Sequence, residues 1–166
     1  VEIFRKNGLK GTFNLNSGLF GKGNRLDIDE VKATYTPDVC EIACHGVTHA
    51  AFSDCDSAVL MSQVVYDRKA LEGITGYPVF GMAYPFGNYS ENVINALKNC
   101  NIKYARTVDG TQNFSLPRRP LAWNPTCHHK NPNLMKLADD FLNAAPRRNP
   151  LLFYVWGHAY EFDDDN

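Results

Sequence analysis

No apolar run in this sequence approaches the roughly 20 residues that a membrane-spanning helix needs. A strong charge of either sign is also lacking, because the formal net charge is −1. Nucleic acids and anionic membranes favour basic surfaces, so neither is expected as the main partner. Internal repeats and low-complexity segments are missing as well. What remains is an ordinary globular composition, with 44% hydrophobic residues in a chain of 166 residues, which is long enough for one domain with a sizeable core.

The sequence also lacks the even, regularly spaced cysteines of a small disulfide-bonded scaffold. Its five cysteines are Cys40, Cys44, Cys55, Cys100 and Cys127. We interpret them as free thiols, which favours a reducing, cytoplasmic compartment. An initiator methionine and a signal peptide are not seen, and the chain opens at Val1 in what reads as the second half of a helix. We therefore expect sequence to be missing at both ends.

Strand-like and helix-like segments alternate along the chain. Short apolar runs predict strands at residues 9–16, 38–45, 78–85, 102–108 and 151–158. Apolar residues at helical spacing predict helices at residues 1–7, 27–35, 53–75, 90–100 and 133–144. The order predicts an α/β fold with mostly parallel strands, in a single domain that spans residues 1–166.

Polar or special residues follow four of the predicted strands. They are His45, the segment Pro85 to Gly87, Arg106 and His158. Because functional residues of parallel α/β folds gather at the carboxyl ends of strands, these four positions can converge on one mouth. Without reference to any family, this arrangement is the strongest indication of a functional site.

A pair of histidines, His45 and His49, stands in the stretch "EIACHGVTHA". Neutral imidazole is a common zinc ligand, and residues four apart share a face if the segment turns helical. A bare pair also fits two unrelated loop histidines. A catalytic zinc has three protein ligands as a rule. The third would be a carboxylate, either from this chain (Asp54, Asp56 or Asp109) or from a strand before Val1.

The sequence contains two other groups of residues that could bind a metal ion. The first is a structural zinc site formed by Cys40, Cys44 and the two histidines. Its spacing counts against it, because the adjacent side chains of Cys44 and His45 diverge, and buried cysteines usually fill a core. The second is "TCHHK", whose adjacent histidines cannot easily share an ion in regular structure, so we interpret them as loop residues.

Four stretches, in the right order, resemble the motifs of the polysaccharide deacetylase family, the NodB-homology domain of carbohydrate esterase family 4. "EIACHGVTHA" is similar to the second motif, H-[ST]-x-x-H, although Gly46 replaces the Ser or Thr. "FRKNGLKGTFNLN" resembles the helix and strand that follow the first motif. "MAYPFGNYS" resembles the third motif, R-x-P-[YF]-G, with Ala83 in place of the Arg. "LLFYVWGHAY" resembles the fifth, L-x-H, with Trp156 at the Leu position.

The resemblance implies a distorted (β/α) barrel, incomplete at the N-terminus, that removes N-acetyl groups from an amino-sugar carbohydrate with a divalent metal, most often Zn²⁺. His45 and His49 would hold the metal, and His158 would protonate the leaving amine. The third ligand, an Asp, and the general base, a second Asp, would lie before residue 1. Arg106 is expected to supply the cation that Ala83 cannot, unless it makes an ordinary ion pair.

The resemblance also implies a carbohydrate-binding surface. Tyr84, Pro85, Phe86 and Trp156 would contact the substrate, with the backbone N–H near Phe86 facing the oxyanion. Phe86 and Trp156 would otherwise be ordinary core residues. Family members are often exported, which conflicts with the compartment that the cysteines favour. Two other functions stay open: a catalytically degenerate carbohydrate-binding module of the same fold, because of Ala83, and a structural zinc protein. The fourth family motif has no match that we can assign.

Overall fold

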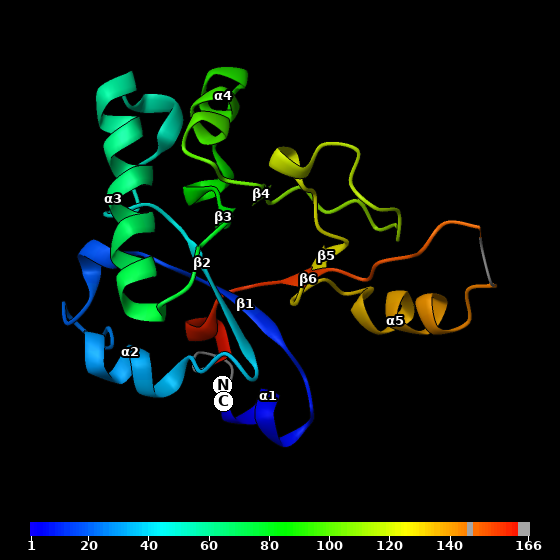
Figure 1. The fold of residues 1–166 in the computed structure, drawn as a ribbon. Coiled ribbons are helices and arrows are strands. Elements are labelled where there is room, and N and C mark those ends of the chain that lie inside the picture. Colours follow the sequence, from blue (N-terminus) through cyan, green and yellow to red (C-terminus); the bar gives the residue numbers. More distant parts are fainter. Residues whose placement is uncertain (146–147, 163–166) are drawn as a thin grey trace.

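The computed structural model describes residues 1–145 and 148–162 (Figure 1). Its helices are α1 (Glu2–Lys6), α2 (Ile28–Thr34), α3 (Ser57–Thr75), α4 (Glu91–Asn99) and α5 (Leu134–Leu142). Its strands are β1 (Gly11–Leu15), β2 (Cys40–Cys44), β3 (Gly81–Ala83), β4 (Tyr104–Arg106), β5 (Cys127–His128) and β6 (Val155–Trp156). Short 3₁₀ turns are η1 (Ser17–Leu19), η2 (Phe52–Asp54), η3 (Pro85–Gly87), η4 (Pro120–Ala122) and η5 (Ala159–Phe162).

The first four strands form one parallel sheet in the order β1-β2-β3-β4. The register sets the carboxyl ends level, because Cys44 pairs with both Leu15 and Met82, and Ala83 pairs with Arg106. Each crossover between these parallel strands passes through helical segments, as parallel pairing requires. The predicted α/β fold with parallel strands is therefore confirmed.

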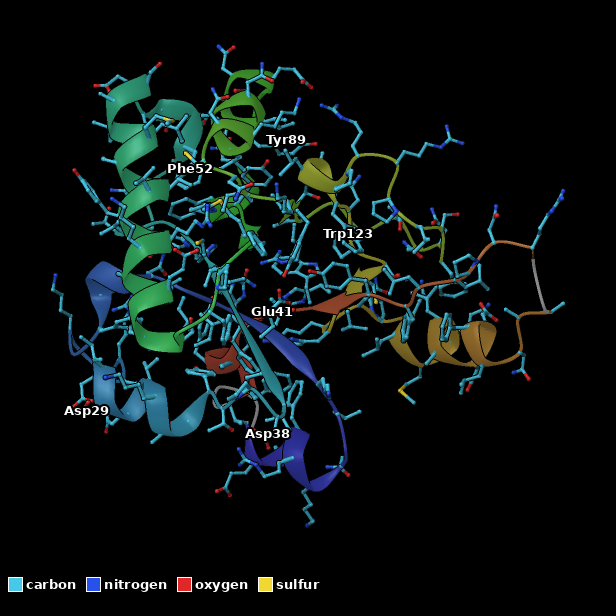
Figure 2. The ribbon with its side chains drawn as sticks, viewed as in Figure 1. Asp29, Asp38, Glu41, Phe52, Tyr89 and Trp123 are labelled. Atoms are coloured by element: carbon cyan, nitrogen blue, oxygen red, sulfur yellow. The ribbon has the colours of Figure 1, made fainter. Side chains whose placement is uncertain are left out.

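The last two strands form a separate parallel pair, β5 with β6. An isolated bridge between Arg106 and Trp123 joins the segment that precedes β5 to the edge of the main sheet, and Trp123 is labelled in Figure 2. The expected strand over residues 151–158 is wrong in length, since only Val155–Trp156 pairs and its partner β5 has two residues. The described strands thus form two sheets without closing a barrel.

The helices begin and end where short-range hydrogen bonds allow. Asp27 and Glu30 make a capping box at the start of α2, and Ser90 accepts the Val93 N–H at the start of α4. Helix α3 begins at Ser57, not at the expected Ser53, because Asp56 accepts the Val59 N–H and caps the helix there. It ends at Gly76, whose φ of 73° suits glycine.

Helices α3 and α4 lie side by side over the main sheet and enclose the core (Figure 1). Phe52, labelled near both helices in Figure 2, is 1% exposed, and Cys44, at the end of β2, is completely buried. All five cysteines are free thiols, which confirms that expectation. None of the described helices is long and apolar enough to cross a membrane.

Candidate active site

The two histidines of the opening pattern lie together directly after β2. Their ring centroids are 4.7 Å apart. The Nδ1 atom of His45 is 2.8 Å from the carbonyl oxygen of Ala83, at the end of β3. Since a carbonyl only accepts, His45 carries its proton on Nδ1 and keeps the Nε2 lone pair for a ligand. His49 has a φ of 61°, a rare backbone conformation that turns its ring toward His45.

Both histidines are kept neutral by their surroundings. Burial lowers the pKa of His45 to about 4, and the charges of His49, Arg106 and His158 act in the same direction. Burial followed by the charge of His158 also lowers the pKa of His49. A neutral imidazole is the form that binds a metal ion. The pair is therefore ready to accept a cation at neutral pH.

Gly46 follows His45 where the family pattern has Ser or Thr. Its φ is 77°, and a Cβ atom added there would lie 3.1 Å from Phe52. Because glycine alone adopts such a φ freely, the local backbone and the close approach of Phe52 explain this departure from the pattern.

The turn η3, which follows β3, brings an aromatic side chain onto His49. Phe86 has a φ of 57°, is 67% exposed, and its ring centroid lies 4.4 Å from that of His49. Pro85 is buried. Tyr84 is also buried, and its hydroxyl donates to the carbonyl oxygen of Leu121 at 2.6 Å. Of the three residues expected to contact substrate in this segment, only Phe86 presents its side chain to solvent.

Arg106, the last residue of β4, is 7% exposed. Its guanidinium lies 4.4 Å above the ring of Trp156, and Nη1 donates to the carbonyl oxygen of Thr107 at 3.0 Å. Among the described residues, no carboxylate oxygen lies within 4.0 Å of it. The expected alternative of an ordinary ion pair is therefore not seen in the described part of the chain. Burial lowers the pKa of Arg106, because a charged group is costly to bury.

His158 follows β6 and faces a carboxylate that sequence reasoning missed. Glu161 Oε2 accepts the backbone N–H of His158 at 2.8 Å and lies 3.0 Å from its Nδ1 atom. Burial raises the pKa of Glu161, but these hydrogen bonds and the charges of His128 and His158 outweigh it and lower the pKa to about 2. Glu161 is therefore ionised at neutral pH. The only hint in the sequence is its place three residues after His158.

The two histidines of "TCHHK" also face Glu161. The interpretation as loop residues is wrong for His128, which lies in a strand, and holds for His129, which lies in the turn that follows. His128 belongs to β5, and its Nε2 is 3.2 Å from Glu161 Oε2, while Nε2 of His129 is 3.6 Å away. Among the described residues, His128, His158 and Glu161 are the only group of three whose ligand atoms lie close enough for one metal ion. However, His128 Nδ1 accepts the Lys130 N–H at 3.2 Å, which places its proton on Nε2, facing the carboxylate. The contacts are those of a hydrogen-bonded network.

The predicted positions thus gather at the carboxyl ends of the strands. Ring contacts join Phe86 to His49 and His49 to His45, and Trp156 joins Arg106 to His158, with ring centroids 5.6 Å apart in the last pair. The charge of His158 reaches both His45 and His49. Within residues 1–145 and 148–162, no His, Cys, Asp or Glu offers a third ligand atom to His45 and His49, so the pair fits two-thirds of a zinc site.

The cysteine-based zinc site does not fit the geometry. Cys40 and Cys44 stand at opposite ends of β2, which separates them by about 13 Å at ~3.3 Å per residue. Burial raises the pKa of Cys44, so its sulfur stays a thiol and not the thiolate that binds zinc. The two cysteines belong to the buried strand beneath the histidines.

Solved structures share this fold. A deacetylase from Streptococcus pyogenes, PplD in complex with acetate, is 21% identical with a TM-score of 0.67, over 74% of this chain and 54% of that one. IcaB from Ammonifex degensii is 13% identical with a TM-score of 0.68, over 86% and 66%. A BA3943 mutant, titled a CE4 family pseudoenzyme, is 20% identical with a TM-score of 0.58, over 93% and 47%.

The chain therefore spans about half to two-thirds of the length of these structures. None of the curated proteins compared with it matches. The family model for polysaccharide deacetylase matches residues 1–105, which contain β1 to β3 and the histidine pair. With more than half of its length under that match, and with the fold of solved deacetylases, this chain belongs to the polysaccharide deacetylase family.

Proposed function

We propose that this chain carries most of the active site of a metal-dependent hydrolase that removes N-acetyl groups from an amino-sugar carbohydrate. The observation that carries the proposal is the pairing of the His45 and His49 rings directly after β2, with centroids 4.7 Å apart. The charge of His158, which follows β6, acts on the pKa of both and supports its place near them. His45 and His49 would be the neutral metal ligands, and His158, which contacts the carboxylate of Glu161, would be the acid. The reaction adds water to the amide, breaks its C–N bond, and yields acetate and a free amine.

His45 and His49 would hold the metal ion, for which Zn²⁺ fits an imidazole donor set best. Their neutral state and the free Nε2 of His45 support this assignment. The third ligand is proposed to be an Asp before residue 1, as the family pattern implies. A bound zinc would polarise the amide carbonyl and lower the pKa of a water toward about 7.

His158 would donate the proton to the leaving amine. Its Nδ1–H donates to Glu161, so the ring is oriented and Nε2 is left for the transferred proton. An ionised Glu161 would stabilise the imidazolium form of His158, which is the form that carries a proton on Nε2 to give to the amine. The neighbouring His128 donates to the same oxygen and fixes the carboxylate from its other side.

Arg106 would balance a negative charge at the site. Its guanidinium has no carboxylate partner among the described residues and lies close enough to His45 to act on its pKa. The natural counter-ions are the general-base Asp, proposed before residue 1, and the oxyanion of the substrate. The guanidinium would thus take the part of the Arg that Ala83 replaces.

Phe86 and Trp156 would wall the acetyl pocket, and Tyr84 and Pro85 would support them from below. In η3, the N–H groups of Gly87 and Asn88 donate to the carbonyl oxygens of Tyr84 and Pro85. The Phe86 N–H is therefore the donor of this turn that we assign to the oxyanion. The exposed Phe86 ring beside His49 offers an apolar face to a sugar.

A second candidate is a carbohydrate-binding module without activity. Ala83 in place of the family Arg favours it, and one structure with this fold is titled a pseudoenzyme. Acetate release from N-acetylglucosamine oligosaccharides separates the two, measured with zinc present on protein that includes the segment before Val1. The hydrolase predicts release that a chelator abolishes, whereas binding of the oligosaccharide without any release would contradict it.

A further inference from the structure

Helix α3 holds the loop that bears both histidines through two polar side chains. Asp67 Oδ2 accepts the backbone N–H of His45 at 2.9 Å. Gln63 Oε1 accepts the N–H of Thr48 at 2.9 Å, and its Nε2 donates to the Thr48 hydroxyl at 3.0 Å. Gln63 and Asp67 are one helical turn apart, so they present their side chains on the same face of α3. They contact the loop next to His45 and next to His49.

The same carboxylate also reaches the segment that follows β1. Asp67 Oδ1 accepts the N–H of Ser17 at 2.8 Å. From that segment, Asn16 Nδ2 donates to the carbonyl oxygens of His45 and Gly46 at 2.6 and 2.8 Å. The ends of β1 and β2 are therefore tied to each other and to α3 around one buried group.

Asp67 occupies a position where the helix calls for an apolar residue. It is 0% exposed, and it lies between the buried Val64 and Leu71 on the inner stripe of α3. An isolated carboxylate in such a place is costly unless its oxygens are hydrogen-bonded. Both oxygens here accept backbone N–H groups, and one of these groups belongs to a proposed metal ligand. Packing alone would favour leucine, so the carboxylate points to a role in the loop it holds.

We propose that Gln63 and Asp67 are positioning residues that hold His45 and His49 in place for metal binding. This inference rests on the proposed function, because it takes the two histidines as the ligands. Neither residue touches the metal or the substrate. Each acts by fixing the backbone from which a ligand projects, as the groups behind metal ligands do.

Two variants and one matched control test the inference. Asp67→Asn keeps one acceptor oxygen and turns an NH₂ group toward the other N–H. Gln63→Leu removes both bonds to Thr48 from a half-buried position with little risk to folding. The control is Glu72→Gln, which alters another α3 carboxylate that accepts a backbone N–H, from Val79 at 3.0 Å, away from the histidines. Each protein includes the segment before Val1 that carries the proposed third ligand, and its zinc affinity is measured by competition with a chromophoric chelator.

We expect zinc affinity to fall about 10–100-fold in Asp67→Asn and in Gln63→Leu, and to stay unchanged in Glu72→Gln. Equal affinity in the wild type, Gln63→Leu and folded Asp67→Asn would overturn the inference. If Asp67→Asn does not fold, Gln63→Leu decides alone. If the wild type binds no zinc, the proposed function fails instead, and ¹⁵N spectra of the His45 ring decide the positioning role. An unchanged Nδ1–H signal in both variants would then overturn it.

Discussion

The Nδ1 atom of His45 lies 2.8 Å from the carbonyl oxygen of Ala83, so the end of β3 sets the tautomer of the residue that follows β2. The contact depends on a register that places neighbouring carboxyl ends level. The hydrogen bond from His45 uses only the backbone carbonyl of residue 83. It can therefore form although Ala83 replaces the Arg of the family pattern. We propose that Arg106 supplies the positive charge that this Arg would have provided.

Replacing His158 by Ala should lower turnover strongly without loss of the metal. General acid catalysis contributes about 10²–10⁴-fold, so kcat should fall within that range. The measurement pairs acetate release with zinc content per protein chain. Lys136→Ala, which breaks an exposed ion pair on α5, serves as the control. Retention of full activity by the His158 variant would show that the proton comes from another group.

Protonation of Glu161 should lower the free energy of unfolding at acid pH. Its pKa of about 2 lies below the ordinary value of 4.5, so it stabilises the folded state above pH 4.5. That contribution, about 1–3 kcal/mol, is lost as the pH falls from about 4.5 toward 2. Urea unfolding at pH 7 and pH 3 should show a smaller drop in Glu161→Gln than in the wild type. A drop of the same size in both proteins would exclude this role.

Arg106→Met should lower activity far more than stability. Methionine is apolar and unbranched, and exchanging a buried charge for an apolar side chain is often neutral for folding. Loss of one group that balances developing charge costs about 10²–10³ in kcat. Acetate release and the free energy of unfolding are measured on the same preparation. If activity falls only in proportion to the unfolded fraction, Arg106 is a packing residue.

Gly46→Ser should destabilise the protein, although the family pattern has Ser or Thr at this place. A side chain at a φ of 77° costs about 1–2 kcal/mol, and the new Cβ atom would press on Phe52. Urea unfolding checks the loss, with Ser62→Ala, on α3, as the control. Equal or greater stability of the serine variant would contradict the geometry described for this loop.

Features of the fold that depend on neighbours in the chain could be predicted from the sequence. The caps Asp27 and Ser90 are examples, because their bonds span three residues. The start of α3 was misplaced because Ser53 and Asp56 both precede the apolar stripe, and only the structure shows that Asp56 accepts the Val59 N–H. The last strand was overestimated because its pairing is limited by the length of β5, which lies far away in the sequence.

The candidate site could be predicted only in part, because only some of its features depend on residues close together in the sequence. The histidine pair is a local pattern, and the ends of parallel strands converge by geometry. Glu161 could not be identified from the sequence, because its role depends on a contact with His128. The two residues are far apart in the chain, and no local pattern connects them. Asp67 lies at helical spacing among the apolar residues of α3, and only its buried hydrogen bonds to Ser17 and His45 show its role.

The most direct test is to identify the ligands of bound zinc, by anomalous diffraction at the zinc edge on crystals of the protein. Our account predicts one ion with His45 Nε2 and His49 among its ligands, and loss of that ion in both His45→Ala and His49→Ala. His129→Ala, which changes a neighbour of Glu161, should leave it in place. An ion held instead by His128, His158 and Glu161, with His45 and His49 unliganded, would contradict the account.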